Sequence, residues 1–364
     1  MFQFMAQGHI IPFLALAFQL IKTNKYTITF VNTHKNINKL RSSLPPNSSF
    51  NLLEIPFNSS DHNLPPDTEN TDSVPYNMAP NLIEATLSFK PHFRKLVSDL
   101  VSEENGQRKP LCIITDMFFG WCAEIAQEFG VFHAIFIGGG GFGEKSAAKF
   151  GQLVLFFCQL EAKLEQEKNL ESPKMFVKLA RFKTLQLSSV VRPPVGFDIN
   201  SEFKADEYLP EGFEERNKIS RQGLVVHNWA PQVDILSHKS VSAFLSHCGW
   251  NSVLEALSHG VPIIGWPMAA KQFYNVKLLE EKMGVCVEVA RGKSCQVKHE
   301  EIVKIIELVM NETEKGMEMR RRACEIKEII ENAIKDEVNN KGSSTKAMDE
   351  FFNAVLTMRE SKMG

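Results

Sequence analysis

The sequence predicts an α/β protein built from two doubly wound domains. Short runs of β-branched residues alternate with helical stretches through most of the chain, which is the pattern of βαβ units and parallel sheets. The chain has 364 residues, and at about 150 residues per domain this length predicts two domains. Hydrophobic residues make up 43% of the chain, which is enough for a sizeable core and argues against global disorder.

The first half of the chain alternates between strands and helices. We expect strands at 2–5, 26–32, 50–57, 111–115 and 131–137, and helices at 10–22, 80–104 and 119–129. The stretch 58–75 is rich in Asn, Ser, Pro and Asp, which predicts a long loop. Loops of that length in compact domains are usually functional or mobile.

The second half repeats the alternation. We expect strands at 223–228, 241–246, 261–266 and 284–289, and helices at 232–239, 249–259, 269–283 and 344–360. The pattern is helical after 144 and loses its periodicity within 171–200. We therefore predict an N-terminal domain over 1–185, a C-terminal domain over 186–342, and a final helix within 343–364 that packs back on the N-terminal domain.

The charge balance excludes one class of partner. The chain carries 41 Lys and Arg against 43 Asp and Glu, a formal net charge of −2. A balance this close to neutral gives no long-range field that would gather phosphate backbones or acidic lipid. The sequence therefore argues against a nucleic-acid binder.

Cysteine usage and the first residues indicate a cytoplasmic protein. The seven cysteines are odd in number and far apart, which favours reduced thiols in the cytosol. The apolar N-terminal stretch lacks a basic leader and is broken by Gln7, His9 and Pro12. It predicts neither a signal peptide nor a transmembrane segment.

Polar residues follow the predicted strand 241–246, at the point where a helix begins. In doubly wound sheets, ligands bind outside the carboxyl ends of the strands. A strand, a turn at Gly249 and a helix N-terminus form an anion site, because unpaired N–H groups point at the ligand. His247 can add a donor to a diphosphate, and Glu255 can accept hydrogen bonds from ribose hydroxyls.

Simpler interpretations stay open for single residues of this segment. Asn251 and Ser252 are as readily helix caps, and Trp229, whose flat face suits a nucleotide base, is more often a core residue. His247 and Cys248 are adjacent and lack a second pair of ligands, so they do not predict a zinc site.

The N-terminal half supplies a candidate acid–base pair. His9 follows the first predicted strand, and Asp116 follows the strand 111–115. A histidine can take the proton of an attacking hydroxyl when a carboxylate orients its ring, which gives about 10²–10⁴-fold in rate. From the residues alone, a helix-start role for His9 is favoured. The glycine tract 138–141 lacks the dinucleotide fingerprint, which argues against a dehydrogenase.

The segment 229–272 resembles the signature box of plant UDP-dependent glycosyltransferases of secondary metabolism. The residues that match at the family's spacing are Trp229, Gln232, His247, Gly249, Trp250, Asn251, Ser252, Glu255, Gly260, Pro262, Trp266, Pro267 and Gln272. The resemblance implies two facing Rossmann-like domains in the GT-B arrangement. It implies inverting transfer of a sugar, most often glucose, from a UDP-sugar to a hydroxyl of a small phenolic or terpenoid-like acceptor.

The resemblance also implies a monomer with UDP-sugar as co-substrate, no further cofactor and no metal. By resemblance, Trp229 stacks on the uracil with backbone contacts from Ala230, and Glu255 takes the ribose. His247 with Asn251 and Ser252 holds the phosphates, and Trp250 and Gln272 face the sugar. Gln232, Gly249 and Lys271 belong to the donor site without a closer assignment. His9 becomes the catalytic base and Asp116 its partner, with the acceptor beside Phe118, Phe119 and the 58–80 loop.

Lys271 departs from the family's pattern, which has Asp or Glu just before the final Gln. An ammonium has three donors and no acceptor, so hydrogen bonds from sugar hydroxyls to a carboxylate are lost or rearranged. The first strand is also clipped, and the family's segments after residue 143 and at the start of the second domain are not recognisable. Two hypotheses stay open: an active glycosyltransferase, and a shortened, catalytically impaired relative that at most binds UDP or a UDP-sugar.

Overall fold

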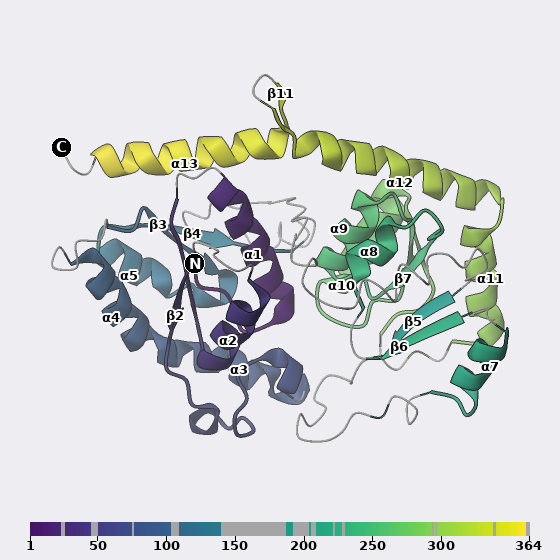
Figure 1. Cartoon of the computed structure of the whole chain (residues 1–364), viewed down its shortest axis with the longest axis horizontal. Coiled ribbons are helices and arrows are strands. Elements are labelled where there is room, and N and C mark those ends of the chain that lie inside the picture. The colour runs from purple at the N-terminus through teal and green to yellow at the C-terminus, as the bar shows by residue number, and fades with distance from the viewer. Residues whose placement is uncertain are drawn as a thin grey trace.

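Two α/β halves lie side by side in the computed structural model, and two long helices run along one side of both (Figure 1). These helices are α12 (Glu314–Ala333) and α13 (Ser343–Ser361). The structure describes residues 1–22, 26–44, 50–74, 76–102, 109–139, 187–191, 204, 209–220, 223–227, 230–292, 295, 297–337 and 340–361. The expected domain junction at 185/186 lies outside the described residues, so the domain borders stay predictions.

The sheet of the first half is parallel, and its strand order reverses in the middle. Strand β1 (Ile28–Asn32) pairs with β2 (Phe50–Glu54), and β3 (Cys112–Asp116) pairs with β4 (Phe132–Phe136). Phe2 forms a parallel bridge to each side, with Val31 and with Thr115, so the first residues lie between β1 and β3. The predicted strand 2–5 is reduced to this bridge. Ligands of such sheets bind where the order reverses.

In the part of the first half that the structure describes, five α-helices cover this sheet. They are α1 (Gln7–Lys22), α2 (His34–Ser43), α3 (Ala79–Ala85), α4 (Phe89–Val101) and α5 (Cys122–Glu128). A single helix was predicted for 80–104, but a 3₁₀ turn at Thr86–Ser88 divides it. The Thr86 and Ser88 hydroxyls each donate to a carbonyl three residues earlier, which is how such side chains compete with a regular helix.

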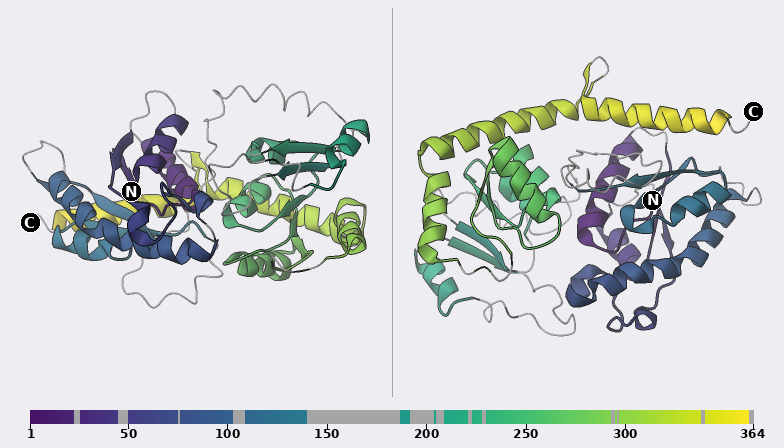
Figure 2. Two further views of the ribbon diagram at one scale, coloured as in Figure 1. Left: turned by 90° about the horizontal axis from the view of Figure 1, so that it is seen from below. Right: turned by 180° about the vertical axis from the view of Figure 1, so that it is seen from behind.

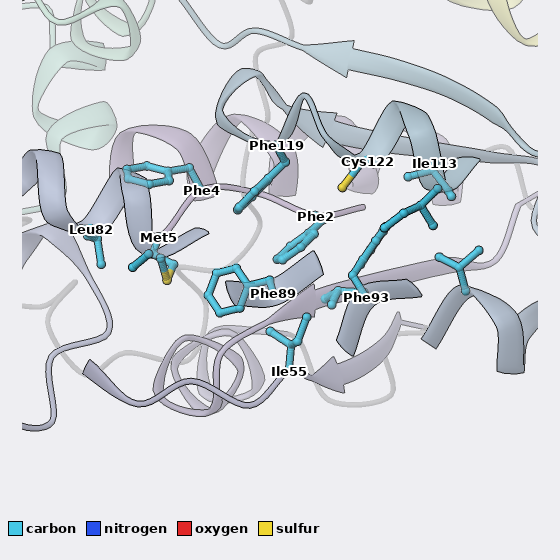
Figure 3. Packing of buried hydrophobic residues seen from close by; sticks show 14 of the residues in the cluster. Phe2, Phe4, Met5, Ile55, Leu82, Phe89, Phe93, Ile113, Phe119 and Cys122 are labelled. Atoms are coloured by element: carbon cyan, nitrogen blue, oxygen red, sulfur yellow. The ribbon is translucent and has the colours of Figure 1, made fainter. Parts of the chain in front are cut away.

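Aromatic stacking builds one core of the first half around Phe2 (Figure 3). The ring of Phe2 stacks on Phe119, with 4.1 Å between centroids, and on Phe93 at 5.0 Å. A second core lies between α1, the sheet and α13. There Phe352 of α13 is buried, with its ring centroid 4.8 Å from that of Tyr26. The last helix thus packs on the first half, as Figure 2 shows from two further sides.

The described residues of the second half form two parallel sheets. Strand β5 (Leu187–Val191) pairs with β6 (Gly223–His227), and β7 (Phe244–Ser246), β8 (Ile263–Gly265) and β9 (Cys286–Glu288) pair in that order. No strand was predicted at β5, because two serines interrupt its apolar run. The sequence predicts that the start of the second domain is incomplete. In the structure, β5 is present at this place, and residues 192–200 lie outside the described residues.

Helices connect these strands and lead into the long pair. They are α7 (Phe213–Ser220), α8 (Gln232–Ser237), α9 (Trp250–Ser258), α10 (Gln272–Lys277), which continues as a π-helical turn at Leu278–Met283, and α11 (His299–Met310). A small antiparallel hairpin of β10 (Asp336–Glu337) and β11 (Asn340–Lys341) separates α12 from α13.

Candidate active site

His9 and Asp116 come together at the point where the strand order of the first sheet reverses. His9 lies in the first turn of α1, and Asp116 is the last residue of β3. The distance between His9 Nδ1 and Asp116 Oδ2 is 2.7 Å. The His9 side chain is 33% exposed, whereas that of Asp116 is 3% exposed. The imidazole can therefore meet a ligand, while the carboxylate behind it is shielded from water.

The second carboxylate oxygen of Asp116 is also held. The backbone N–H of Phe118 donates to Asp116 Oδ1 at 3.2 Å. An ionised carboxylate only accepts hydrogen bonds, so the shared hydrogen is assigned to Nδ1 of His9. The neutral imidazole then presents Nε2 as an acceptor, and this arrangement suits removal of a proton from a bound hydroxyl.

Two phenylalanines flank the imidazole of His9. The ring centroid of Phe4 lies 5.5 Å and that of Phe118 lies 5.6 Å from the His9 ring. Phe118 is partly exposed, whereas the adjacent Phe119 is fully buried against Phe2. Of the two residues expected beside an acceptor, the structure therefore brings Phe118 to His9 and places Phe119 in the core.

The loop between β7 and α9 is held in an unusual backbone conformation. Cys248 is buried and has a φ of 60°, a region that non-glycine residues rarely adopt. Its N–H donates to Ser246 Oγ at 3.1 Å, and its carbonyl accepts from Asn275 Nδ2 at 2.9 Å. A Cβ on Gly249 would lie 2.5 Å from His247 Nε2. A side chain at residue 249 would thus displace the imidazole of His247 from its place beside the start of α9.

Three expected donor-site residues form one hydrogen-bonded group. Gln232, at the start of α8, donates through Nε2 to Ser252 Oγ at 3.2 Å and to Glu255 Oε2 at 2.6 Å. Both partners lie on α9, one turn apart, so α8 and α9 are joined at the end that faces the first half. Ala230 is buried beside this group, and Trp229 lies outside the described residues.

The side chain of Gln272 is anchored by the turn that precedes α10. Its Oε1 accepts from the backbone N–H groups of Met268 at 2.8 Å and Ala269 at 2.9 Å. The amide of Gln272 consequently keeps its orientation. Trp250, the first residue of α9, is partly buried and packs on the core of the second half.

A comparison with protein families and with curated proteins identifies the chain. Residues 210–357 match the family described as UDP-glucoronosyl and UDP-glucosyl transferase. UDP-glycosyltransferase 92A1 of Arabidopsis thaliana is 38% identical, over 99% of this chain and 97% of the relative. The chain belongs to the UDP-glycosyltransferase family. Crocetin glucosyltransferase 3 of Crocus sativus is a further relative, 32% identical over 87% of this chain and 91% of its own length.

Solved structures confirm the predicted GT-B fold of this glycosyltransferase. Glycyrrhiza uralensis UGT73P12, complexed with glycyrrhetinic acid 3-O-monoglucuronide, has a TM-score of 0.78 and covers 100% of this chain and 96% of its own, at 19% identity. TcCGT1 in complex with UDP has a TM-score of 0.75 at 21% identity, with 98% of each chain covered. The two facing Rossmann-like domains are therefore the fold of the chain.

This glycosyltransferase is shorter than its Arabidopsis relative. That alignment extends over 477 positions, whereas the chain has 364 residues, which leaves at least 113 positions without a counterpart here. Because 97% of the relative is nevertheless covered, the missing positions lie mainly within the aligned region rather than beyond its ends.

The elements that carry the expected donor-site residues lie beside the His9–Asp116 pair. Lys271 Nζ is 3.9 Å from Met117 Sδ, and Asn251 Nδ2 donates to the Gly8 carbonyl at 3.4 Å. Burial lowers the pKa of Lys271, and the negative charge of Asp116 opposes part of this shift. The two halves thus meet at the candidate site, with an ammonium of the second half next to the carboxylate of the first.

Sequence reasoning missed some residues that shape the site. Asn275, which holds the Cys248 carbonyl, carried no sequence signal, because its contact depends on how α10 packs on the loop. The open carbonyl of Gly8, in contrast, did have a signal in the sequence. Pro12 follows it by four residues within α1, and a proline there cannot donate to that carbonyl.

Two further properties concern the described residues alone. In that part of the chain, no group of three or more His, Cys, Asp or Glu side chains is arranged to hold a metal ion. None of the helices described is long and apolar enough to cross a membrane.

Proposed function

We propose that this glycosyltransferase transfers glucose from UDP-glucose to a hydroxyl of a small phenolic or terpenoid-like acceptor, with inversion at the anomeric carbon. The observation that carries the proposal is the His9–Asp116 pair, which lies against the donor elements of the second half. The names of curated relatives support the choice of sugar, because one is a UDP-glucose flavonoid 3-O-glucosyltransferase from Fragaria ananassa.

The proposed mechanism uses two kinds of stabilisation. Nε2 of His9 takes the proton of the acceptor hydroxyl, and Asp116 stabilises the imidazolium that forms. The acceptor oxygen attacks the anomeric carbon from the face opposite UDP, and the bond from that carbon to the diphosphate oxygen breaks. The N-terminus of α9 and His247 stabilise the charge that develops on the leaving diphosphate.

The remaining residues would position the two substrates. Glu255 and Gln232 would hold the ribose, with Trp229 and Ala230 at the uracil, while Ser252 adds to the phosphate site. Asn251 would add to the phosphate site, and Trp250, Gln272 and Lys271 would lie nearest the sugar. The partly exposed Phe118, which packs on the buried Phe4, offers an apolar surface beside His9 that suits a flat or hydrophobic acceptor.

A second candidate function is nucleotide binding without turnover. One argument for it is that at least 113 positions of the alignment with the Arabidopsis relative have no residue in this chain. The other is the ammonium of Lys271, at a place where the family pattern has a hydrogen-bond acceptor. The same donor residues would then bind UDP, but no acceptor would be glycosylated.

Calorimetric titration with UDP and then with UDP-glucose, followed by a UDP-release assay with phenols and terpenoid alcohols, separates the two functions. Transfer that is abolished in His9→Ala, with UDP affinity nearly intact, would support the glycosyltransferase. UDP binding without release for any acceptor would support the second function. A folded chain that binds neither nucleotide would contradict both.

We also propose that the protein is a cytoplasmic monomer. The six cysteines of the described residues are all free thiols, as expected for a reducing compartment. Analytical ultracentrifugation tests the monomer, and a fluorescent fusion tests the location.

A further inference from the structure

The second half touches the chain neighbours of both residues of the catalytic pair. Asn251 donates to the carbonyl of Gly8, which directly precedes His9. Lys271 lies against Met117, which directly follows Asp116. Asn251 thus contacts the backbone next to the imidazole, and Lys271 contacts the side chain next to the carboxylate.

The Gly8 carbonyl is available to Asn251 because of Pro12. In a regular helix, the N–H of residue 12 would donate to the carbonyl of residue 8. Proline has no N–H, so this bond of α1 is missing. The ring of Pro12 is closely packed on its other side, since a Cβ on Gly138 would lie 2.9 Å from Pro12 Cγ. The open carbonyl therefore finds its partner in the other half of the molecule.

Both donor-side residues stand at the start of helices whose positions are fixed. Asn251 belongs to the first turn of α9, and the preceding Cys248 is held by Asn275. Lys271 immediately precedes α10, where Gln272 is anchored to its own turn. A shift of the second half would consequently be transmitted to Gly8 and Met117.

We propose that Asn251 and Lys271 are positioning residues, which dock the second half on Gly8 and Met117 and so hold His9 and Asp116 in register with the donor site. Closing of the two halves and alignment of the catalytic pair then become one event. The proposal rests on the proposed function for what the pair does, whereas the docking contacts are between residues of the chain itself.

Pro12→Ala tests the docking without changing any donor-side residue. It supplies the missing N–H, which competes with Asn251 for the Gly8 carbonyl, and it keeps the Cβ that packs beside Gly138. The readout is the NMR signal of the His9 imidazole in the donor-free protein, identified by its loss in His9→Ala. We expect Pro12→Ala and Asn251→Ala each to shift this signal, and the double variant to shift it no further than Asn251→Ala.

The matched control is Pro91→Ala in the first turn of α4, which should leave the His9 signal in place. For the contact between Lys271 and Met117, Lys271→Met should shift the His9 signal, whereas Lys271→Arg should leave it at its original position. A His9 signal that stays at its original position in Pro12→Ala, Asn251→Ala and Lys271→Met would overturn the proposal. The NMR test does not depend on nucleotide binding, so this outcome is decisive even if the chain binds no UDP. A failure to bind UDP would by itself refute only the proposed function.

Kinetics add a second test. The kcat of Pro12→Ala should fall about five- to tenfold, as expected for the loss of one hydrogen bond, while the Kd for UDP stays unchanged. A loss of UDP affinity with kcat unchanged would place the effect in donor binding and contradict a positioning role.

Discussion

Nδ1 of His9 lies 2.7 Å from Oδ2 of Asp116, whose other oxygen is bound by the N–H of Phe118. The carboxylate is thus held at both oxygens by residues of the chain itself. It selects one tautomer of the imidazole, in which Nε2 is free of the ring proton.

Asp116→Asn should lower kcat about 10²–10⁴-fold, because an amide no longer enforces the proton on Nδ1. The Kd for UDP should change little, since the pair does not contact the nucleotide. The exposed Asp72→Asn is the control. Steady-state kinetics with UDP calorimetry check this, and a kcat within threefold of the control would remove Asp116 from the mechanism.

Lys271→Glu should tighten UDP-glucose more than UDP. The change replaces three donors by acceptors, which the sugar hydroxyls can use and the nucleotide cannot. Lys282→Glu, an exposed lysine at the end of the same helical segment, makes the same change of charge away from the site. Calorimetry on both variants is the measurement, and equal effects on UDP and UDP-glucose would refute contact between residue 271 and the sugar.

Phe118→Ala and Phe119→Ala should behave differently although the residues are adjacent. Phe118→Ala should raise the KM for acceptors and leave the fold intact, because the ring is partly exposed beside His9. Phe119→Ala should cost about 3–5 kcal/mol of unfolding free energy, because its ring is fully buried. Acceptor kinetics and thermal unfolding distinguish them. An unchanged KM for every acceptor in Phe118→Ala would remove it from the acceptor site.

Gly249→Ala should weaken UDP binding at least about tenfold, which corresponds to about 1.4 kcal/mol. The added Cβ would lie 2.5 Å from His247 Nε2, so the imidazole must leave its place over α9. Gly120→Ala is the matched control, since no atom lies within 4 Å of its added Cβ. Calorimetry checks the pair, and UDP affinity equal to that of Gly120→Ala would exclude His247 from the phosphate site.

His133 predicts part of the acid sensitivity of the fold. Burial lowers the pKa of His133 to about 4, and its Nε2 lies 2.9 Å from Thr115 Oγ1. The ordinary pKa of a histidine is about 6.5, so below this pH the unfolded chain binds a proton that the folded chain does not. The free energy of unfolding therefore decreases as the pH is lowered from about 6.5 to about 4. Up to about 2 kcal/mol should be lost between pH 6.5 and 5.

The measurement is thermal unfolding at pH 7 and pH 5. His133→Gln should lose less stability than the unaltered chain on this change, whereas exposed His92→Gln should lose as much. Equal losses in His133→Gln and the unaltered chain would show that His133 does not carry the effect.

The site residues that follow strands could be predicted from the sequence, but the contacts made by the side chains around them could not. His9, Asp116 and His247 were found because each follows a strand in a sheet whose ligand edge is known in advance. The choice between Phe118 and Phe119 was not accessible, because it depends on how the 3₁₀ turn Met117–Phe119 rotates two identical side chains. Pairing of Asn251 with Gly8, 243 residues apart, likewise needs the folded chain.

The strands and helices could be located from the sequence where the hydrophobic pattern is strong. Strands β1, β3 and β4 were located to within two residues, because β-branched and aromatic residues dominate them. Strand β5 was missed because polar residues interrupt it, and the helix break at Thr86–Ser88 was missed because hydroxyl bonds to the backbone leave no trace in periodicity.

The helices α12 and α13 join the cores of the two halves. Ile330 of α12 is buried in the core of the second half, and Phe352 of α13 is buried in a core of the first half. The first half is therefore completed by residues that come last in the sequence. Its second core can close only once the whole chain has been synthesised.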